Sequence, residues 1–157
     1  MIIKRLVLSL LALIITASIS SAQRFPVKVI GISDGDTFTV INRDNLQLKI
    51  RVYGIDAPEK KQAYGNKSKQ ALSALIFGKS IEIDVQSQEK WGRYVAKVYT
   101  PDGQDVALLM LQSGMAWHYT RFDQTPSYAK AQETAKKAGK GLWADKNPVA
   151  PWDFRHN

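Results

Sequence analysis

Three short segments of this sequence bring acidic and basic residues together beside turns. They are residues 34–37 (Asp-Gly-Asp-Thr), residues 51–59 (Arg-Val-Tyr-Gly-Ile-Asp-Ala-Pro-Glu) and residues 90–93 (Lys-Trp-Gly-Arg). Each segment alone is typical of an ordinary structure: a tight turn, a solvated loop, and a hairpin loop with a basic surface. Together they supply three aspartates, a glutamate and two arginines, which is a set that can do chemistry.

These residue types suit the hydrolysis of a phosphodiester bond. Attack by water increases the negative charge on the non-bridging phosphate oxygens, and arginine forks and a divalent cation stabilise that charge. A hard cation such as Ca²⁺ binds carboxylate and carbonyl oxygens and keeps water molecules where the protein supplies few ligands. A carboxylate near the attacking water can orient or deprotonate it. A glycine-bearing loop with two cations and an indole can hold a phosphate and stack a base.

In this order and spacing, the three segments resemble the staphylococcal nuclease (thermonuclease) family. The resemblance extends over about residues 27–143 and includes Tyr64-Gly65, Gly114-Met115-Ala116 and Gly141-Leu142-Trp143. The sequence Pro-Trp-Asp-Phe-Arg at residues 151–155 is similar to the tails of exported bacterial members. The resemblance implies an OB-fold barrel with three helices. It also implies a calcium-dependent endo- and exonuclease that cleaves single-stranded or locally melted DNA and RNA, leaving 3′-phosphate and 5′-hydroxyl products.

The resemblance assigns metal binding to three residues. Asp36 and Asp56 would bind Ca²⁺ through their carboxylates, and Ala57 would add its backbone carbonyl. The best-known member has a threonine at the position of Ala57, but a carbonyl ligand does not depend on the side chain. Asp34 would support these ligands without binding the ion itself.

The resemblance also assigns roles toward the substrate. Arg51 and Arg93 would bind the scissile phosphate, and Glu59 would position or deprotonate the attacking water. Lys90 and Trp91 would line the pocket for a neighbouring phosphate and base.

One departure from the family pattern lies in residues 117–122. The best-known member places tyrosines beside the nucleotide, and simple alignment puts Thr120 and Phe122 at those positions. Base stacking is therefore an open question. His118 could be taken for a catalytic acid, but we interpret it as a polar residue on a short extended stretch.

Hydrophobic periodicity predicts the elements that must position these residues. Alternating or β-branched segments predict strands at residues 25–33, 37–42, 46–52, 81–85 and 93–100. Helical spacing, caps and terminal glycines predict helices that end at Gly78, Gly114 and Gly139. Five short strands with a helix between the third and fourth suit a Greek-key barrel of the OB type. We therefore predict an α+β fold dominated by a five-stranded barrel, with three α-helices.

The first 22 residues have the pattern of a secretory signal peptide. Lys4 and Arg5 precede a nearly apolar run from Leu6 to Ala17, and small residues stand before a cleavage position after Ala22. The run is shorter than the ~20 residues that a spanning helix needs, so we prefer cleavage to a membrane anchor. We expect an exported protein, periplasmic or secreted, with a nuclease domain at residues 23–145 and a tail at 146–157 that packs as an irregular strap.

Composition narrows the classes of function. The sequence contains no cysteine, which excludes thiolate catalysis and zinc–cysteine sites. Without the predicted signal peptide, 20 Lys and Arg face 14 Asp and Glu, a net charge of +6 that favours polyanionic partners. We expect a monomer with no obligate protein partner and no membrane association after cleavage.

Two other functions compete with the nuclease. The first is a catalytically inactive OB-fold module that binds nucleic acid or protein. Such a copy would be expected to lose Arg51, Glu59 or Arg93, and all three are present. The second is a basic domain for anionic glycans or lipid surfaces, which gives no reason for acidic residues beside the arginines.

Overall fold

The computed structural model describes residues 23–156. The predicted signal peptide, residues 1–22, lies outside the described residues, so its cleavage stays a prediction. Within the described part of the chain, no helix is long and apolar enough to cross a membrane.

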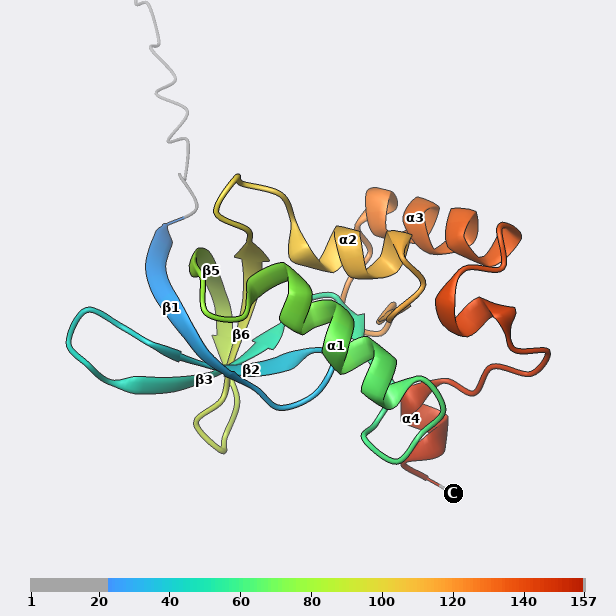
Figure 1. Ribbon diagram of the computed structural model, residues 1–157, viewed down its shortest axis with the longest axis horizontal. Coiled ribbons are helices and arrows are strands. Elements are labelled where there is room, and N and C mark those ends of the chain that lie inside the picture. Colours follow the sequence, from blue (N-terminus) through green and yellow to red (C-terminus); the bar gives the residue numbers. More distant parts are fainter. Residues whose placement is uncertain (1–22, 157) are drawn as a thin grey trace, which may run out of the picture.

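A closed five-stranded barrel forms one half of the molecule (Figure 1). Its strands are β1 (Arg24–Ile32), β2 (Thr37–Ile41), β3 (Gln47–Val52), β5 (Ser80–Gln88) and β6 (Tyr94–Tyr99). They are hydrogen-bonded in the order β1-β2-β3-β6-β5, and β1 pairs with β5 to close the barrel. Only β3 and β6 pair in parallel within it. The predicted barrel and its five strands are confirmed.

The barrel interior is filled by the apolar residues whose alternation predicted the strands. Phe38, Val40, Ile50 and Val52 are fully buried. The apolar core continues beneath the helices, where residues such as Leu72 pack against it. The barrel is therefore a packed core, and the polar residues that remain at its strand ends are free to form a site.

The three predicted helices are α1 (Gly65–Ile76), α2 (Val106–Gln112) and α3 (Pro126–Lys137). Two of them, α1 and α2, pack on the barrel, and α3 packs on α2. The side chain of Asp105 accepts a hydrogen bond from the backbone N–H of Leu108 at 3.2 Å, as expected for the cap of α2. A 3-10 helix, η1 (Gly141–Ala144), follows α3.

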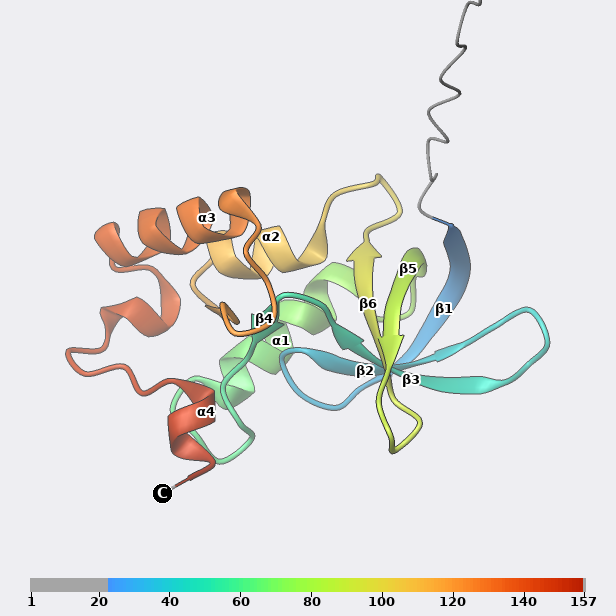
Figure 2. The same ribbon diagram turned by 180° about the vertical axis from the view of Figure 1, so that it is seen from behind.

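Two further elements were not predicted as such. Strands β4 (Ile55–Asp56) and β7 (Trp117–His118) form a separate two-stranded antiparallel sheet, and Figure 2 shows β4 between the barrel and the helices. His118 lies on this extended stretch, as interpreted, and is buried.

The C-terminal tail ends in a short helix, α4 (Pro151–Phe154), instead of the irregular strap that we expected. Proline at the first helical position starts this turn. Trp152 stacks on Tyr119, with ring centroids 5.4 Å apart and planes at 5°. The tail therefore packs on the loop that follows β7.

Candidate active site

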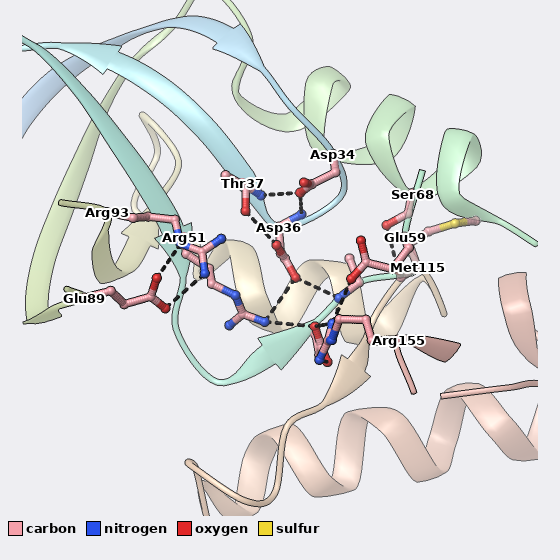
Figure 3. A network of polar contacts seen from close by, with 12 residues as sticks. Asp34, Asp36, Thr37, Arg51, Glu59, Ser68, Glu89, Arg93, Met115 and Arg155 are labelled. Carbon is pink, nitrogen blue, oxygen red and sulfur yellow. Dashed lines mark hydrogen bonds and ion pairs between the residues drawn. The ribbon is translucent and has the colours of Figure 1, made fainter. Parts of the chain in front are cut away.

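A cavity of about 600 Å³ opens where β2, β3, β4, the β5–β6 hairpin and α4 meet. Five carboxylates and three arginines line it: Asp34, Asp36, Asp56, Glu59, Glu89, Arg51, Arg93 and Arg155. Figure 3 shows most of these side chains in one network of polar contacts.

The turn before β2 fixes Asp36. The carboxylate of Asp34 accepts hydrogen bonds from the backbone N–H groups of Asp36 at 3.1 Å and Thr37 at 2.8 Å. Gly35 separates Asp34 from Asp36 and lies very close to helix α1 and Ala57. A Cβ added to it would be 2.7 Å from the Cβ atoms of Ser68 and Ala57. The turn therefore needs glycine at this position, and Asp34 supports Asp36 through the backbone.

Strand register brings Arg51 to the carboxylates. Arg51 pairs with Thr37 across β2 and β3, next to Asp36. Its Nη2 lies 2.9 Å from Oδ1 of Asp56 and 3.4 Å from Oδ2 of Asp36. Asp36 also accepts a hydrogen bond at 2.8 Å from the backbone N–H of Ala57. One arginine thus joins the ends of β2, β3 and β4.

Glu59 lies in the loop between β4 and α1. Its backbone N–H donates to the side chain of Gln62 at 3.0 Å. Helix α1 begins so near this loop that a Cβ on Gly65 would lie 2.9 Å from the carbonyl carbon of Glu59. The Glu59 side chain stays partly exposed, at 37%, toward the cavity.

Arg93 approaches from the base of the β5–β6 hairpin. It follows β5 in sequence, and the parallel pairing of β3 with β6 places it beside the Arg51 strand. Glu89 binds it with two contacts, at 2.8 Å from Nε and 3.0 Å from Nη2. Both predicted phosphate-binding arginines therefore line one cavity, and both are paired with carboxylates.

Arg155 is a site residue that sequence reasoning missed. Its Nη2 lies 2.8 Å from Oδ2 of Asp56, and its Nη1 lies 3.2 Å from Oδ1 of Asp56 and 2.8 Å from Oε1 of Glu59. The only signal was the resemblance of residues 151–155 to family tails, which carried no role for a particular side chain.

Burial works against the charges of the aspartates. It raises the pKa of Asp56 above its ordinary value, and the charge of Asp36 adds to the rise, although Arg155 and Arg51 oppose it. The pKa of Asp34 is also raised, first by burial and then by Asp36. Burial lowers the pKa of Arg51, but Asp36 and Asp56 outweigh this and raise it.

The cavity carries an excess of two negative charges, because it holds five carboxylates and three guanidinium groups. A divalent cation would balance that excess, and carboxylate oxygens are ligands that Ca²⁺ prefers. Among residues 23–156, no three or more His, Cys, Asp or Glu side chains form a cluster that could hold a metal. The predicted site uses only two such side chains, Asp36 and Asp56, with the carbonyl of Ala57. These residues fit a hard cation in donor type and in charge.

Two predicted residues do not reach the cavity. Lys90 and Trp91 form the tip of the β5–β6 hairpin, which extends beyond the barrel in Figure 1, and neither lines the cavity. The Trp91 side chain is 93% exposed. Both residues therefore lie outside the cavity, and their role toward a neighbouring phosphate and base stays a prediction.

The aromatic side chains beside the cavity match the alignment at one of its two positions. Tyr119 and Phe122 line it, and Thr120 does not. The two rings meet edge to face with centroids 4.8 Å apart. Phe122 is 63% exposed at the rim. Tyr53, also unpredicted, lines the same side and donates to the Phe122 carbonyl at 3.2 Å. A base could therefore stack on Phe122.

Known proteins resemble this chain over most of its length. The family described as staphylococcal nuclease homologue matches residues 49–145. An uncharacterized endonuclease of Haemophilus influenzae is 41% identical over 152 residues, covering 97% of this chain and 85% of that protein. An uncharacterized endonuclease of Escherichia coli is 37% identical, covering 82% of this chain and 84% of that protein. A probable staphylococcal-like nuclease of Oryza sativa subsp. japonica is 40% identical, covering 90% of this chain but 36% of the plant protein.

Proposed function

This chain belongs to the staphylococcal nuclease family, and we propose that it is a calcium-dependent nuclease acting on single-stranded or locally melted DNA and RNA. The observation that carries the proposal is the convergence of Arg51, Arg93, Asp36, Asp56 and Glu59 on one cavity from separate elements. A protein that only bound nucleic acid would need the arginines but gains nothing from a concentration of carboxylates, which repel phosphate.

The chain's own residues divide the reaction among them. Asp36 and Asp56, with the carbonyl of Ala57, would hold Ca²⁺, which when bound supplies further stabilisation of charge on the phosphate. Arg51 and Arg93 donate to the non-bridging phosphate oxygens, and Arg93 exchanges Glu89 for the substrate when it does so. Donors fixed in place before the reaction stabilise the developing charge most effectively.

Glu59 is the group placed to act on water. It is partly exposed to the cavity and lies near Asp56, with which it shares the guanidinium of Arg155. Its carboxylate orients a water molecule or takes its proton as the phosphorus–oxygen bond forms. The bond to the 5′-oxygen then breaks and that oxygen takes a proton from solvent water, giving the 3′-phosphate and 5′-hydroxyl products that family resemblance implies.

The protein's location and assembly belong to the same proposal. A signal peptide over residues 1–22 would place the enzyme outside the cytoplasm, in the periplasm or the medium. A monomer suffices for catalysis, since one chain supplies all the residues that line the cavity.

Digestion of single-stranded DNA and RNA tests the function directly. We expect cleavage with added Ca²⁺, none with a calcium chelator, and 3′-phosphate ends on the products. Magnesium demands stricter geometry than this small ligand set offers, so it should support little cleavage. Equal rates in calcium-free magnesium would count against the calcium site, and no cleavage under any of these conditions would favour the inactive binding module.

A further inference from the structure

Arg155 takes up the carboxylates on which the proposed metal site depends. Its two terminal nitrogens contact both oxygens of Asp56 and one oxygen of Glu59, at 2.8 to 3.2 Å. Figure 3 shows the Arg155 side chain beside Glu59, within the network that also contains Asp36 and Arg51. Asp56 is 2% exposed and Arg155 is 38% exposed, so the contact joins a buried anion to the cavity opening.

The tail is built to deliver this side chain. Pro151 is buried, and Trp152 stacks on Tyr119, which itself lines the cavity. The side chain of Gln62, three residues from Glu59, donates to the carbonyl of Val149 at 2.7 Å. Helix α4 is therefore anchored just before the residue that it presents, and Arg155 reaches a site 99 residues away in sequence.

A cation on Asp56 and the guanidinium of Arg155 compete, because both are positively charged and both draw on the same two oxygens. Each contact of Arg155 uses a terminal nitrogen, and a guanidinium has five N–H donors in one plane, a geometry that matches phosphate as well as carboxylate. Arg155 lines the same cavity as Arg51 and Arg93. A phosphate bound there offers it another partner within reach of its present position.

We propose that Arg155 is a third phosphate-binding arginine of this site, held on Asp56 and Glu59 until a phosphate draws it away and leaves Asp56 to the metal. The proposal rests on the proposed function and deepens it. Its consequence is coupling: Arg155 weakens calcium binding in the free protein and makes calcium and nucleotide strengthen each other. Such coupling is reciprocal, so each ligand changes the affinity of the other by the same factor.

Calorimetry on the full chain without the signal segment tests this, with Ca²⁺ and a mononucleotide as probes. A mononucleotide carries a phosphate but no phosphodiester bond, so turnover does not interfere. In the wild type, a saturating mononucleotide should tighten calcium binding severalfold. In Arg155→Ala, calcium alone should bind about two- to fivefold more tightly, the range expected for loss of a partly exposed ion pair. The mononucleotide should bind more weakly, and the coupling should largely disappear.

Two further variants sharpen the comparison. Arg155→Lys keeps the charge but not the planar fork, so it should hold the carboxylates and still bind the mononucleotide poorly. Lys146→Ala removes one positive charge from the same tail at an exposed position and should match the wild type. Circular dichroism confirms that each variant is folded.

Calcium and mononucleotide affinities in Arg155→Ala equal to those of the wild type would overturn the proposal. So would weaker calcium binding by that variant, or a wild type that binds no calcium. The parallel assay of wild-type cleavage in calcium keeps the two ideas apart, because an active enzyme without Arg155-dependent coupling retains the proposed function and loses only this inference.

Discussion

At the scale of single residues, Arg93 has to exchange one partner for another. Glu89 holds it with two contacts, and a phosphate would take the same fork. Arg93→Lys cannot reproduce that planar geometry. We expect a loss of about a hundred- to a thousandfold in cleavage rate, the usual effect of removing one preorganised donor. Initial rates on single-stranded DNA measure this, and Arg43→Lys, the same change at an exposed turn, should be silent. A folded Arg93→Lys enzyme with a near wild-type rate would remove Arg93 from the site.

Glu59 offers a second test at this scale. Glu59→Gln keeps the shape of the side chain but cannot accept a proton from water, so turnover should fall heavily. Binding of a short single strand should persist, because the arginines remain. Comparing the rate with the affinity separates the two roles. Glu133→Gln on the surface of α3 is the matched control. Loss of binding together with the rate would instead make Glu59 a structural residue.

The sequence made most of these residues visible, but not all. Asp36, Arg51, Asp56, Glu59 and Arg93 belong to short motifs whose spacing follows the ends of strands. Arg155 has no such pattern, since its partners lie 96 and 99 residues away and its approach depends on how α4 packs. Lys90 and Trp91 lie outside the cavity for the opposite reason. They stand beside Arg93 in sequence, but they form the turn of the hairpin, whereas Arg93 lies next to β6, where the hairpin meets the barrel.

At the scale of elements, periodicity was enough for the barrel and the three main helices. Periodicity could not predict β4 and β7, because each strand has only two residues and so shows no alternation. Their pairing, with Ile55 opposite His118, joins segments that are far apart in the sequence. Helix α4 is a single turn that starts at Pro151, too short for helical spacing to appear. These small elements matter for the site: β4 carries Asp56, and α4 presents Arg155.

The connection from β7 to α3 depends on one buried carboxylate. Asp123 lies 2.7 Å from Nε2 of His118 and accepts hydrogen bonds from the backbone N–H and the hydroxyl of Thr125, at 3.0 and 2.7 Å. Burial acts to raise its pKa, but the hydrogen bonds from Thr125 and His118 outweigh burial and lower the pKa below the ordinary 3.8. A carboxylate in this state stabilises the fold above its ordinary pKa, and that stability is lost as pH falls through the lowered value.

Asp123→Asn should therefore destabilise the protein most at neutral pH. We expect a loss of about 1.5–3 kcal/mol in the free energy of unfolding, the range for hydrogen bonds to a charged group. The difference from the wild type should shrink as the pH is lowered below the ordinary carboxyl value of 3.8 and through the lowered pKa of Asp123. Urea unfolding at several pH values measures it. Asp44→Asn, in an exposed turn, supplies the control. A difference that did not change with pH would mean that the charge of Asp123 is unimportant.

At the scale of the whole molecule, a positively charged domain contains a negatively charged cavity. Residues 23–157 carry a net charge of +6, while the cavity holds an excess of two negative charges. The remaining residues therefore carry about +8, which draws in a polyanion. The acidic cavity in turn draws in a cation. The separation of signs lets one small domain gather both substrate and metal without either excluding the other.

Binding of single strands should therefore depend strongly on salt and weakly on sequence. In chelator, where no cleavage is expected, log affinity against log salt should fall with a slope of about −0.7 for each phosphate neutralised. Contacts to phosphates and stacked base faces make base identity a minor factor. Fluorescence anisotropy with short labelled strands of different composition measures both effects. Arg43→Ala, outside the cavity, should lower the slope only if the strand passes over that part of the barrel, so a set of such variants maps its path. An affinity independent of salt, or one confined to a single sequence motif, would contradict this electrostatic account of how the chain meets nucleic acid.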